Sequence, residues 1–371
     1  MFYYQWRFII MMETPPIIPS SYYKRLMIWS GIVMVWMFIY ELICMVMLSI
    51  VLYGVYHYTI YKRNKEVKID VTGKAIFITG CDTGIGHELA LTTNDQGFVV
   101  FAGCLDPDGN GAEILRSRSS KRIHIVKLDV TNDEQVEDSL QYVKNTCKEN
   151  GLVLWALINN AGIATEGPIE LLNISEYKRV GDINLYGTVR VTKAFIPLLR
   201  QSKGRIMNMS SERAIRFPAM SSVYCMSKAG VEAFSDSLRL EMSRFGVMVS
   251  IIEPGHFGQA TAILHQPVIN RNRKLMETEF ENSPDVVKGV KKVYCQQDID
   301  AVLDAMVGSI ATGFPHLQPL LNVMASALVD PNPRERYLVG GTNGLVDPRS
   351  VICRLKTYLP DSIIDVITGM V

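Results

Sequence analysis

Beyond residue 72, short runs of consecutive apolar residues alternate with longer segments whose apolar positions recur at helical spacing. Residues 86–96, 133–149 and 227–245 are segments of the second kind. Strands buried on both faces of a parallel sheet have such apolar runs, and crossover helices need connecting segments of this length. The expected strands are residues 75–79, 98–103, 123–128, 153–158, 205–209, 248–252 and 337–339. The pattern predicts an α/β fold with a doubly wound, Rossmann-type parallel sheet of about seven strands.

Residues 26–60 have a different pattern, because they are apolar without a polar face. The only acidic or basic side chains there are Glu41 and His57, and aromatic residues lie near both ends. The segment exceeds the ~20 apolar residues that a bilayer span needs, and as one straight helix it would be about 50 Å long. We expect either one span over about residues 42–60, preceded by an interfacial segment, or a hairpin that turns near Glu41.

Length and charge indicate how this segment is used. It is too long for a cleaved signal peptide and lacks the Arg- and Ser-rich amphipathic character of a mitochondrial presequence. Lys62, Arg63, Lys65 and Lys68 follow it, so a single span would place the next domain in the cytoplasm, an inference that a hairpin weakens. We predict a tail at residues 1–25, a membrane anchor at 26–60, a basic linker at 61–72, the α/β domain at 73–345 and an amphipathic tail at 346–371. That last tail would close a ligand pocket, rest on the membrane or pack on the core.

Composition and charge narrow the function classes. The formal net charge is +1 with lysines and arginines scattered along the chain, which provides no footprint for nucleic acid. The seven cysteines lie far apart, without a CxxC pair or a histidine cluster, so we expect neither a disulfide framework nor a metal site. Most of these cysteines are expected to be small buried hydrophobic residues in a reducing compartment.

A glycine-rich turn follows the first expected strand and begins the next helix. Residues 79–86 read T-G-C-D-T-G-I-G. Glycines are needed where backbone passes close to a pyrophosphate, and the free N–H groups at the start of a helix hold that anion. The candidate dinucleotide-binding residues of this turn are Gly80, Asp82, Thr83, Gly84, Ile85 and Gly86.

This TGxxxGxG spacing resembles the short-chain dehydrogenase/reductase superfamily, and further motifs of that family follow in order as far as residue 258. Asp129 with Val130 resembles the pair beside the adenine ring, and Asn160-Ala161-Gly162 completes an NNAG turn that steadies the fourth strand. Pro254-Gly255 resembles the turn below the nicotinamide. The resemblance implies an NAD(P)-dependent alcohol dehydrogenase that moves a hydride between the cofactor and a secondary alcohol or ketone.

A tyrosine and a lysine at helical spacing carry the candidate catalytic chemistry. Tyr224 and Lys228 lie on one helix face, and Ser211 precedes the tyrosine by thirteen residues. A phenol with a pKa of ~10 is a poor base at neutral pH, but a nearby ammonium and the nicotinamide charge would lower that pKa. Ser211 would hold the substrate oxygen against the phenol. By the family resemblance, Lys228 also holds the nicotinamide ribose and Asn184 orders a proton-relay water.

The second expected strand bears on the choice between NAD(H) and NADP(H). NADP enzymes need positive charge near the ribose 2′-phosphate, and NAD enzymes usually place a carboxylate on the 2′-hydroxyl. Cys104 occupies the family's usual aspartate position, which removes the plainest NAD marker. No Arg or Lys follows directly, however, and both Asp82 and Asp106 would repel a phosphate. We therefore expect NAD(H) rather than NADP(H) as the cofactor.

Three longer stretches, at residues 101–105, 184–193 and 231–236, are similar to one branch of the superfamily. That branch holds D-β-hydroxybutyrate dehydrogenase, 17β-hydroxysteroid dehydrogenase type 2 and the retinol dehydrogenases. The resemblance implies a steroid-like or retinoid-like substrate, or 3-hydroxybutyrate. We expect substrate selection to lie within residues 256–332. Arg213 would either pair with a substrate carboxylate or remain a solvated loop residue.

The expected surroundings follow from the anchor and the family. The partners are a small-molecule alcohol or ketone and a lipid bilayer, either that of the endoplasmic reticulum or, alternatively, the mitochondrial inner membrane. A homodimer is left open. The rival hypothesis is a non-catalytic membrane protein that binds a dinucleotide as a sensor or scaffold. Such a protein would lose Ser211, Tyr224 or Lys228 first, and all three are present.

Overall fold

The computed structural model describes residues 20–65, 68–118, 122–282, 294–341, 348–356 and 363. The chain divides into two compact units, Met1–Val67 and Lys68–Val371. Within the described residues, the first unit consists of a single helix, and the second contains a sheet with its covering helices.

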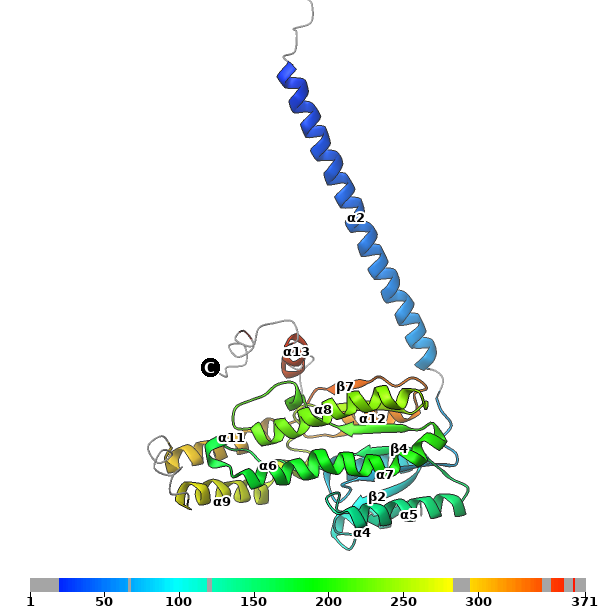
Figure 1. The fold of residues 1–371 in the computed structure, drawn as a ribbon, viewed down its shortest axis with the longest axis vertical. Helices are drawn as coiled ribbons and strands as arrows, with labels where there is room; N and C mark the ends of the chain where they lie inside the picture. Colours follow the sequence, from blue (N-terminus) through cyan, green and yellow to red (C-terminus); the bar gives the residue numbers. More distant parts are fainter. Residues whose placement is uncertain are drawn as a thin grey trace, which may run out of the picture. The chain divides into compact units, whose positions relative to one another are not determined.

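The helix of the first unit, α2 (Ser20–Lys65), is uninterrupted and is drawn in blue in Figure 1. It does not turn at Glu41, so the predicted hairpin is wrong, and no break divides an interfacial segment from a span at residues 42–60. The physical reason is that the helix contains no proline and that its glycines are isolated, so nothing interrupts its hydrogen-bond ladder. The helix also starts inside the predicted tail and ends inside the predicted basic linker.

The part of α2 from Met27 to Tyr56 is the one candidate membrane span that the described residues contain. Large apolar side chains are exposed along it, as Trp36 at 70% and Leu48 at 58% illustrate. A helix that is apolar all round is suited to an apolar environment. Its 30 residues would extend about 45 Å, which exceeds a hydrocarbon core of about 30 Å and calls for tilt or for ends that reach the headgroups.

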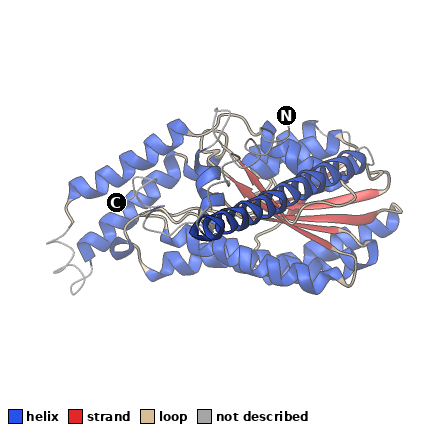
Figure 2. Cartoon of the chain, turned by 90° about the horizontal axis from the view of Figure 1, so that it is seen from above, coloured by secondary structure: helices blue, strands red, loops and turns tan. Residues whose placement is uncertain are grey.

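Seven parallel strands form one sheet in the order β3-β2-β1-β4-β5-β6-β7. Figure 2 shows them in red between helices on both faces. The strand order reverses between β1 and β4, as in a doubly wound sheet, and the predicted fold class is confirmed. The strands are β1 (Lys74–Thr79), β2 (Val99–Cys104), β3 (Ile123–Lys127), β4 (Val153–Asn159), β5 (Arg205–Met209), β6 (Met248–Pro254) and β7 (Arg336–Val339).

Alternate residues of the central strands lie in two separate cores. Ile76 and Ile78 of β1 belong to the core beneath α3, α4 and α12, whereas Phe77 belongs to the core beneath α5, α7 and α8. Because both faces are covered, each strand has the continuous apolar run from which it was predicted. These helices are α3 (Gly84–Asp95), α4 (Asn110–Arg118), α5 (Asp133–Glu149), α7 (Gly187–Ser202), α8 (Ser222–Ser243) and α12 (Gln318–Val329).

A third core, which includes Val180 and Met306, joins α8 to three of the four remaining helices. The buried Cys353 of the last helix lies 3.8 Å from the Glu212 carbonyl oxygen, so this part of the predicted C-terminal tail packs on the domain. The rest of that tail, apart from residue 363, lies outside the described residues. These elements are α6 (Ile174–Gly181), α9 (Gln266–Asn282), α11 (Gln296–Thr312) and α13 (Pro348–Leu355), with the short turns η1 (Ile169–Leu171), η2 (Asp182–Tyr186), η3 (Glu212–Ala214) and η4 (Ala262–Leu264).

The side chain of Arg205 in β5 forms hydrogen bonds with the end of α12. It is only 2% exposed, and its guanidinium donates to the carbonyl of Ala327 at 2.5 Å and to that of Asp330. It also lies 5.1 Å from the ring centroid of Trp155, whose Nε1 donates to the Leu328 carbonyl at 3.0 Å. The carbonyls that a helix leaves unpaired at its C-terminal end are thus satisfied by β4 and β5.

Candidate active site

A cavity of about 660 Å³ opens beyond the carboxyl ends of the strands. It is lined by Gly80 after β1, Leu105 after β2, Asn160 after β4 and Ser210 after β5. It therefore includes the crevice between β1 and β4, where the strand order reverses and where ligands of doubly wound sheets bind.

Most of the predicted site residues line this one cavity. Gly86 and Asn184 are the two that do not. The residues that do line it are Gly80, Asp82, Thr83, Gly84, Ile85, Asp106, Asp129, Val130, Asn160, Ala161, Gly162, Ser211, Tyr224, Lys228, Pro254 and Gly255.

The glycine turn has the backbone that its sequence requires. Gly80 and Gly84 have φ of 70° and 66°, which side-chain-bearing residues rarely adopt. A Cβ at Gly86 would collide with the Gly80 carbonyl and the Asn160 amide, so this glycine allows α3 to pack closely without touching the cavity. Thr83 makes no side-chain cap at the start of α3, which leaves the first N–H groups of the helix available to an anion.

Asp82 joins the glycine turn to the end of β2. Its carboxylate accepts hydrogen bonds from the backbone N–H groups of Leu105 at 3.0 Å and Asp106 at 2.9 Å. Cys104, at the position where the family usually has aspartate, is buried, and burial raises the pKa of its thiol to about 12. The acidic groups at this end of the cavity are therefore Asp82 and Asp106, not the residue that ends the strand.

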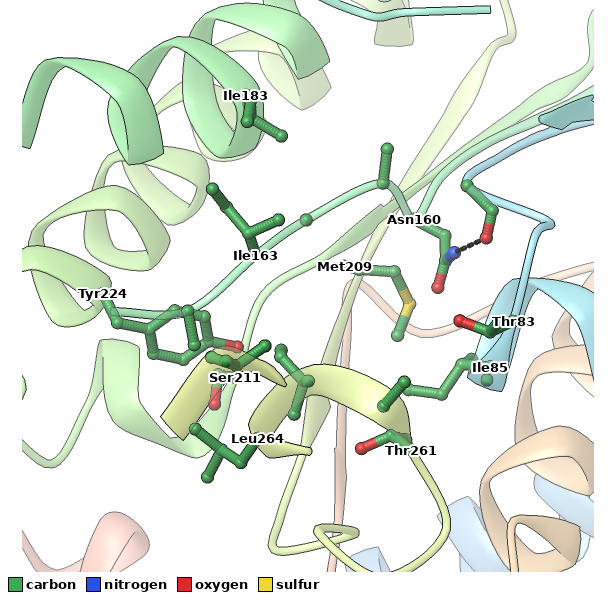
Figure 3. Close-up of a pocket in the computed structure, with 18 of the residues that line it drawn as sticks. Thr83, Ile85, Asn160, Ile163, Ile183, Met209, Ser211, Tyr224, Thr261 and Leu264 are labelled. Atoms are coloured by element: carbon green, nitrogen blue, oxygen red, sulfur yellow. Dashed lines mark hydrogen bonds between the residues drawn. The ribbon is translucent and has the colours of Figure 1, made fainter. Parts of the chain in front are cut away.

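The remaining positions of the predicted dinucleotide site are braced by local hydrogen bonds. Asp129 accepts from the backbone N–H and hydroxyl of Thr131 at 2.9 and 2.7 Å. The Asn160 amide donates to the carbonyls of Thr79 and Gly80 at 2.9 and 3.0 Å, and Figure 3 shows Asn160 across from Thr83 and Ile85. The uncapped helix start, the glycine turn and this bracing fit a bound dinucleotide.

Ser211, Tyr224 and Lys228 come together in the same cavity, each less than 9% exposed. Ser211 follows the end of β5, and Tyr224 and Lys228 lie on the first turns of α8. Figure 3 shows the phenol oxygen of Tyr224 beside Ser211, with Leu264 nearby. The helix begins at Ser222, five residues earlier than predicted, so the whole Tyr-x-x-x-Lys motif is helical.

The electrostatics of this group differ from the sequence-based expectation. Burial raises the pKa of the Tyr224 phenol to about 12, although the nearby guanidinium of Arg213 and a hydrogen bond with Ser211 lower it. Burial also lowers the pKa of the Lys228 amine to about 8. The amine donates to the Met209 carbonyl at 2.7 Å and lies 5.7 Å from the phenol ring centroid. In the absence of a cofactor, the ammonium is not what acidifies the phenol.

Asn184 lies behind the cavity wall in η2, a single π-helical turn between α6 and α7. Its amide exchanges two hydrogen bonds of 2.9 Å with the backbone of Ile163 and donates to Ser227 at 2.9 Å. A Cβ at Gly162 would lie 3.3 Å from Asn184 Oδ1 and 3.5 Å from Lys228 Nζ. Asn184 therefore stands close to the lysine, but its side chain is occupied in holding the loop after β4.

Of its two predicted alternatives, Arg213 departs from that of a solvated loop residue. Its side chain is 17% exposed, so it is no solvated loop residue, and its guanidinium is already ion-paired with the carboxylate of Glu166. Both residues line the cavity. Glu166 had no motif to mark it, because its partner lies 47 positions later in the chain.

The wall that follows Pro254-Gly255 combines apolar and cationic side chains. Phe257, Ile263 and Leu264 line it, together with Arg271 of α9. Arg271 shares the buried carboxylate of Glu176 with Arg179, which also lines the cavity, and these hydrogen bonds hold the pKa of that carboxyl at about 2. The sequence placed substrate selection in this region without identifying these residues.

Over the parts of the chain that the structure describes, no three His, Cys, Asp or Glu residues are grouped to hold a metal ion. All seven cysteines are free, and the five outside Cys44 and Cys295 are buried, as predicted.

The sequence profile of a family described as short chain dehydrogenase matches residues 74–267. D-beta-hydroxybutyrate dehydrogenase, mitochondrial, of Bos taurus is 38% identical over 78% of this chain and 83% of that protein. 17-beta-hydroxysteroid dehydrogenase type 6 of Homo sapiens is 37% identical over 85% of this chain and 93% of that protein. Retinol dehydrogenase 16 of Homo sapiens is 36% identical over the same shares.

Among solved structures, a short-chain dehydrogenase from Streptomyces avermitilis superposes with a TM-score of 0.58. The alignment covers 80% of this chain and 96% of that one at 20% identity, so the likeness concerns the fold.

Proposed function

Since the chain belongs to the short-chain dehydrogenase family, in the branch that its sequence predicted, we propose that it is an NAD-dependent oxidoreductase of secondary alcohols or ketones. The observation that carries the proposal is the meeting of Ser211, Tyr224 and Lys228 in the cavity that the glycine turn also lines. A dinucleotide sensor or scaffold would need the turn but not this buried group, whose ionisable members are costly to desolvate.

In the oxidation direction, the Tyr224 oxygen takes the proton of the substrate hydroxyl, and the Ser211 hydroxyl donates to the same carbinol oxygen. Lys228, fixed by the Met209 carbonyl, faces the phenol ring from the next turn of α8 and would hold the nicotinamide ribose. Bound NAD supplies an acceptor for the carbinol hydride and a positive ring charge that favours the phenolate. Asn184 positions this group through the loop after β4.

NAD is proposed over NADP because of the charges at the end of β2. Asp82 and Asp106 both line the cavity there, and Asp82 is held in place by two backbone N–H groups. A carboxylate beside the adenosine ribose suits a 2′-hydroxyl and repels a 2′-phosphate.

Substrates are proposed from the cavity wall and the relatives. The apolar side chains of Phe257, Ile263 and Leu264 suit a lipophilic alcohol such as a hydroxysteroid or a retinol. The second candidate, 3-hydroxybutyrate, is favoured by Arg179 and Arg271, two guanidiniums that share one carboxylate. We propose that α2 anchors the enzyme in the endoplasmic reticulum membrane, where lipophilic substrates partition, or alternatively in the mitochondrial inner membrane.

A panel of oxidations tests the proposal. The full-length protein in detergent is supplied with a hydroxysteroid, a retinol or 3-hydroxybutyrate and with NAD or NADP, and reduced cofactor is followed by absorbance. We expect turnover of at least one substrate with NAD, and a loss of about 100-fold or more in Ser211→Ala. Binding of NADH without turnover of any substrate would favour the dinucleotide-binding scaffold instead.

A further inference from the structure

A buried ion pair lies beside the catalytic group and has no part in the mechanism above. Arg213 follows Ser211 by two residues, and its backbone N–H donates to Ser211 Oγ at 3.2 Å. Its guanidinium donates to the Glu166 carboxylate and, at 2.5 Å, to Ser221 Oγ. The three residues therefore connect the loop after β4, the turn after β5 and the start of α8.

This connection fixes a positive charge close to the phenol. The side chains of Arg213 and Glu166 are 17% and 10% exposed, so the pair is largely shielded from water and ions, and its field on neighbouring groups is screened less than at the surface. Ser221 directly precedes α8, and Tyr224 lies three residues further on. Arg213 and Tyr224 also line the same cavity, so the guanidinium and the phenol belong to one wall of the site.

The charged and polar groups that face the phenol come from four elements. Arg213 is the largest influence that lowers the pKa of Tyr224 and Ser211 the second, whereas Cys225 and Glu166 raise it. Lys228 is turned to the Met209 carbonyl. These groups are Ser211 at the end of β5, Arg213 of η3, Cys225 and Lys228 of α8, and Glu166 of the loop after β4.

We propose that the guanidinium of Arg213, held by Glu166 and Ser221, favours the phenolate of Tyr224, and that Glu166 limits this effect by neutralising the guanidinium. This inference rests on the proposed function and deepens it. It also gives Arg213 a role other than binding a substrate carboxylate, because such a carboxylate would have to displace Glu166 from a buried ion pair.

Opposite charge changes at the two ends of the pair test the proposal. In the full-length protein, Arg213→Met removes the positive charge, and Glu166→Gln leaves it uncompensated. We expect the rising limb of the pH profile of kcat/KM for oxidation to move to higher pH in Arg213→Met and to lower pH in Glu166→Gln. At pH 7 the Arg213→Met rate would fall by about 10-fold or more, and Arg213→Lys would recover part of it.

A matched control comes from the same loop. Arg216 is 13% exposed and paired with Glu212 at 3.6 Å, and it is not among the largest influences on the Tyr224 phenol. Arg216→Met removes a buried charge of equal size and should leave the rising limb of the pH profile of kcat/KM at the same pH. A limb that stays in place in Arg213→Met, or that moves the same way in Arg213→Met and Glu166→Gln, would overturn the proposal. An equal shift of this limb in Arg216→Met would also overturn the proposal.

A second readout separates this inference from the proposed function. If the wild-type protein turns over no substrate, the proposed function fails, but the phenol can still be titrated by NMR of ¹³C-labelled tyrosine, with Tyr224→Phe assigning the signal. The Tyr224 resonance should then titrate at lower pH in Glu166→Gln than in the wild type. An unchanged titration would contradict the inference independently of any activity.

Discussion

At the scale of single residues, the site contains groups that work against folding. Lys228 is 4% exposed, and burial lowers the pKa of its amine from 10.5 to about 8. Between these two pH values the unfolded chain keeps a proton that the folded protein has released, so folding stability rises with pH across that window. Below about pH 8 both states are protonated, and the folded protein holds a buried ammonium at full cost.

Lys228→Met should therefore stabilise the cofactor-free protein at pH 7. The expected gain is on the order of 3 kcal/mol at most, reduced by the loss of the hydrogen bond to the Met209 carbonyl. The gain should shrink as the pH rises from 8 toward 10.5, because the wild type then loses its buried charge. Thermal melts at several pH values measure this. A variant that is less stable than the wild type at pH 7 and equally so at pH 10 would contradict it.

Residue patterns in the sequence predicted the catalytic group but not its surroundings. Ser211, Tyr224 and Lys228 follow a spacing that a helix and a strand end impose, so they could be read from the chain. Glu166 pairs with Arg213 47 positions away, and Glu176 pairs with Arg271 95 positions away as well as with Arg179 in its own helix. No local rule links the two distant pairs. Burial, which raises the phenol pKa of the cofactor-free protein more than the nearby charges lower it, also could not be predicted, because it depends on the complete fold.

At the scale of elements, Asp82 and Arg205 each join segments that are distant in the sequence. Asp82 holds the end of β2 against the glycine turn, and Arg205 holds the end of α12 against β5. The hydrogen bonds of Asp82 shape the cofactor end of the cavity, and those of Arg205 stabilise the sheet. Their replacement should therefore have different consequences.

Asp82→Asn should shift the cofactor preference toward NADP. The change removes a negative charge near the expected 2′-position while an amide oxygen can still accept one of the two backbone hydrogen bonds. We expect the ratio of kcat/KM with NADP to kcat/KM with NAD to rise about 10-fold. Asp108→Asn, exposed in the loop after β2 and outside the cavity lining, is the control. A ratio that is unchanged in Asp82→Asn would exclude Asp82 from cofactor selection.

Arg205→Met should destabilise the domain by about 2–5 kcal/mol, because two carbonyls at the end of α12 lose their buried donors. Chemical denaturation of the wild type and the variant measures the difference. Arg200→Met, on the exposed face of α7, should change stability by less than about 0.5 kcal/mol. Equal losses of stability in Arg205→Met and Arg200→Met would show that the hydrogen bonds of Arg205 contribute little to stability.

The strands, which were predicted from runs of apolar residues, were placed accurately. The N-terminal helix, which was predicted from the length of its apolar segment, was placed less accurately. The apolar runs of the seven strands placed each within two residues, because a sheet covered on both faces requires such runs. The length of the apolar segment at 26–60 suggested a break at Glu41, but a single glutamate, itself a good helix former, does not end a helix that contains no proline.

At the scale of the whole molecule, the chain combines a cavity-bearing domain with a helix that is apolar on all sides. If α2 spans a bilayer, the full-length protein should remain with membranes after alkaline carbonate extraction. Two arginines near the middle of the span, as in Val46→Arg with Ser49→Arg, should release it, because each costs about 2.5–3.5 kcal/mol at the bilayer centre. Arginines in place of Glu88 and Thr92, on the domain helix α3, provide the control. Extraction of the wild type by carbonate would contradict membrane anchorage.

The most direct test of the account compares turnover with cofactor binding in Tyr224→Phe. This replacement removes only the phenol oxygen from a buried side chain whose ring packs in the third core. We predict that NAD-linked oxidation falls by at least about 1,000-fold while the NADH dissociation constant, measured by fluorescence titration, stays within about twofold. Turnover that persists in Tyr224→Phe with unchanged NADH binding would contradict the claim that this phenol exchanges the proton.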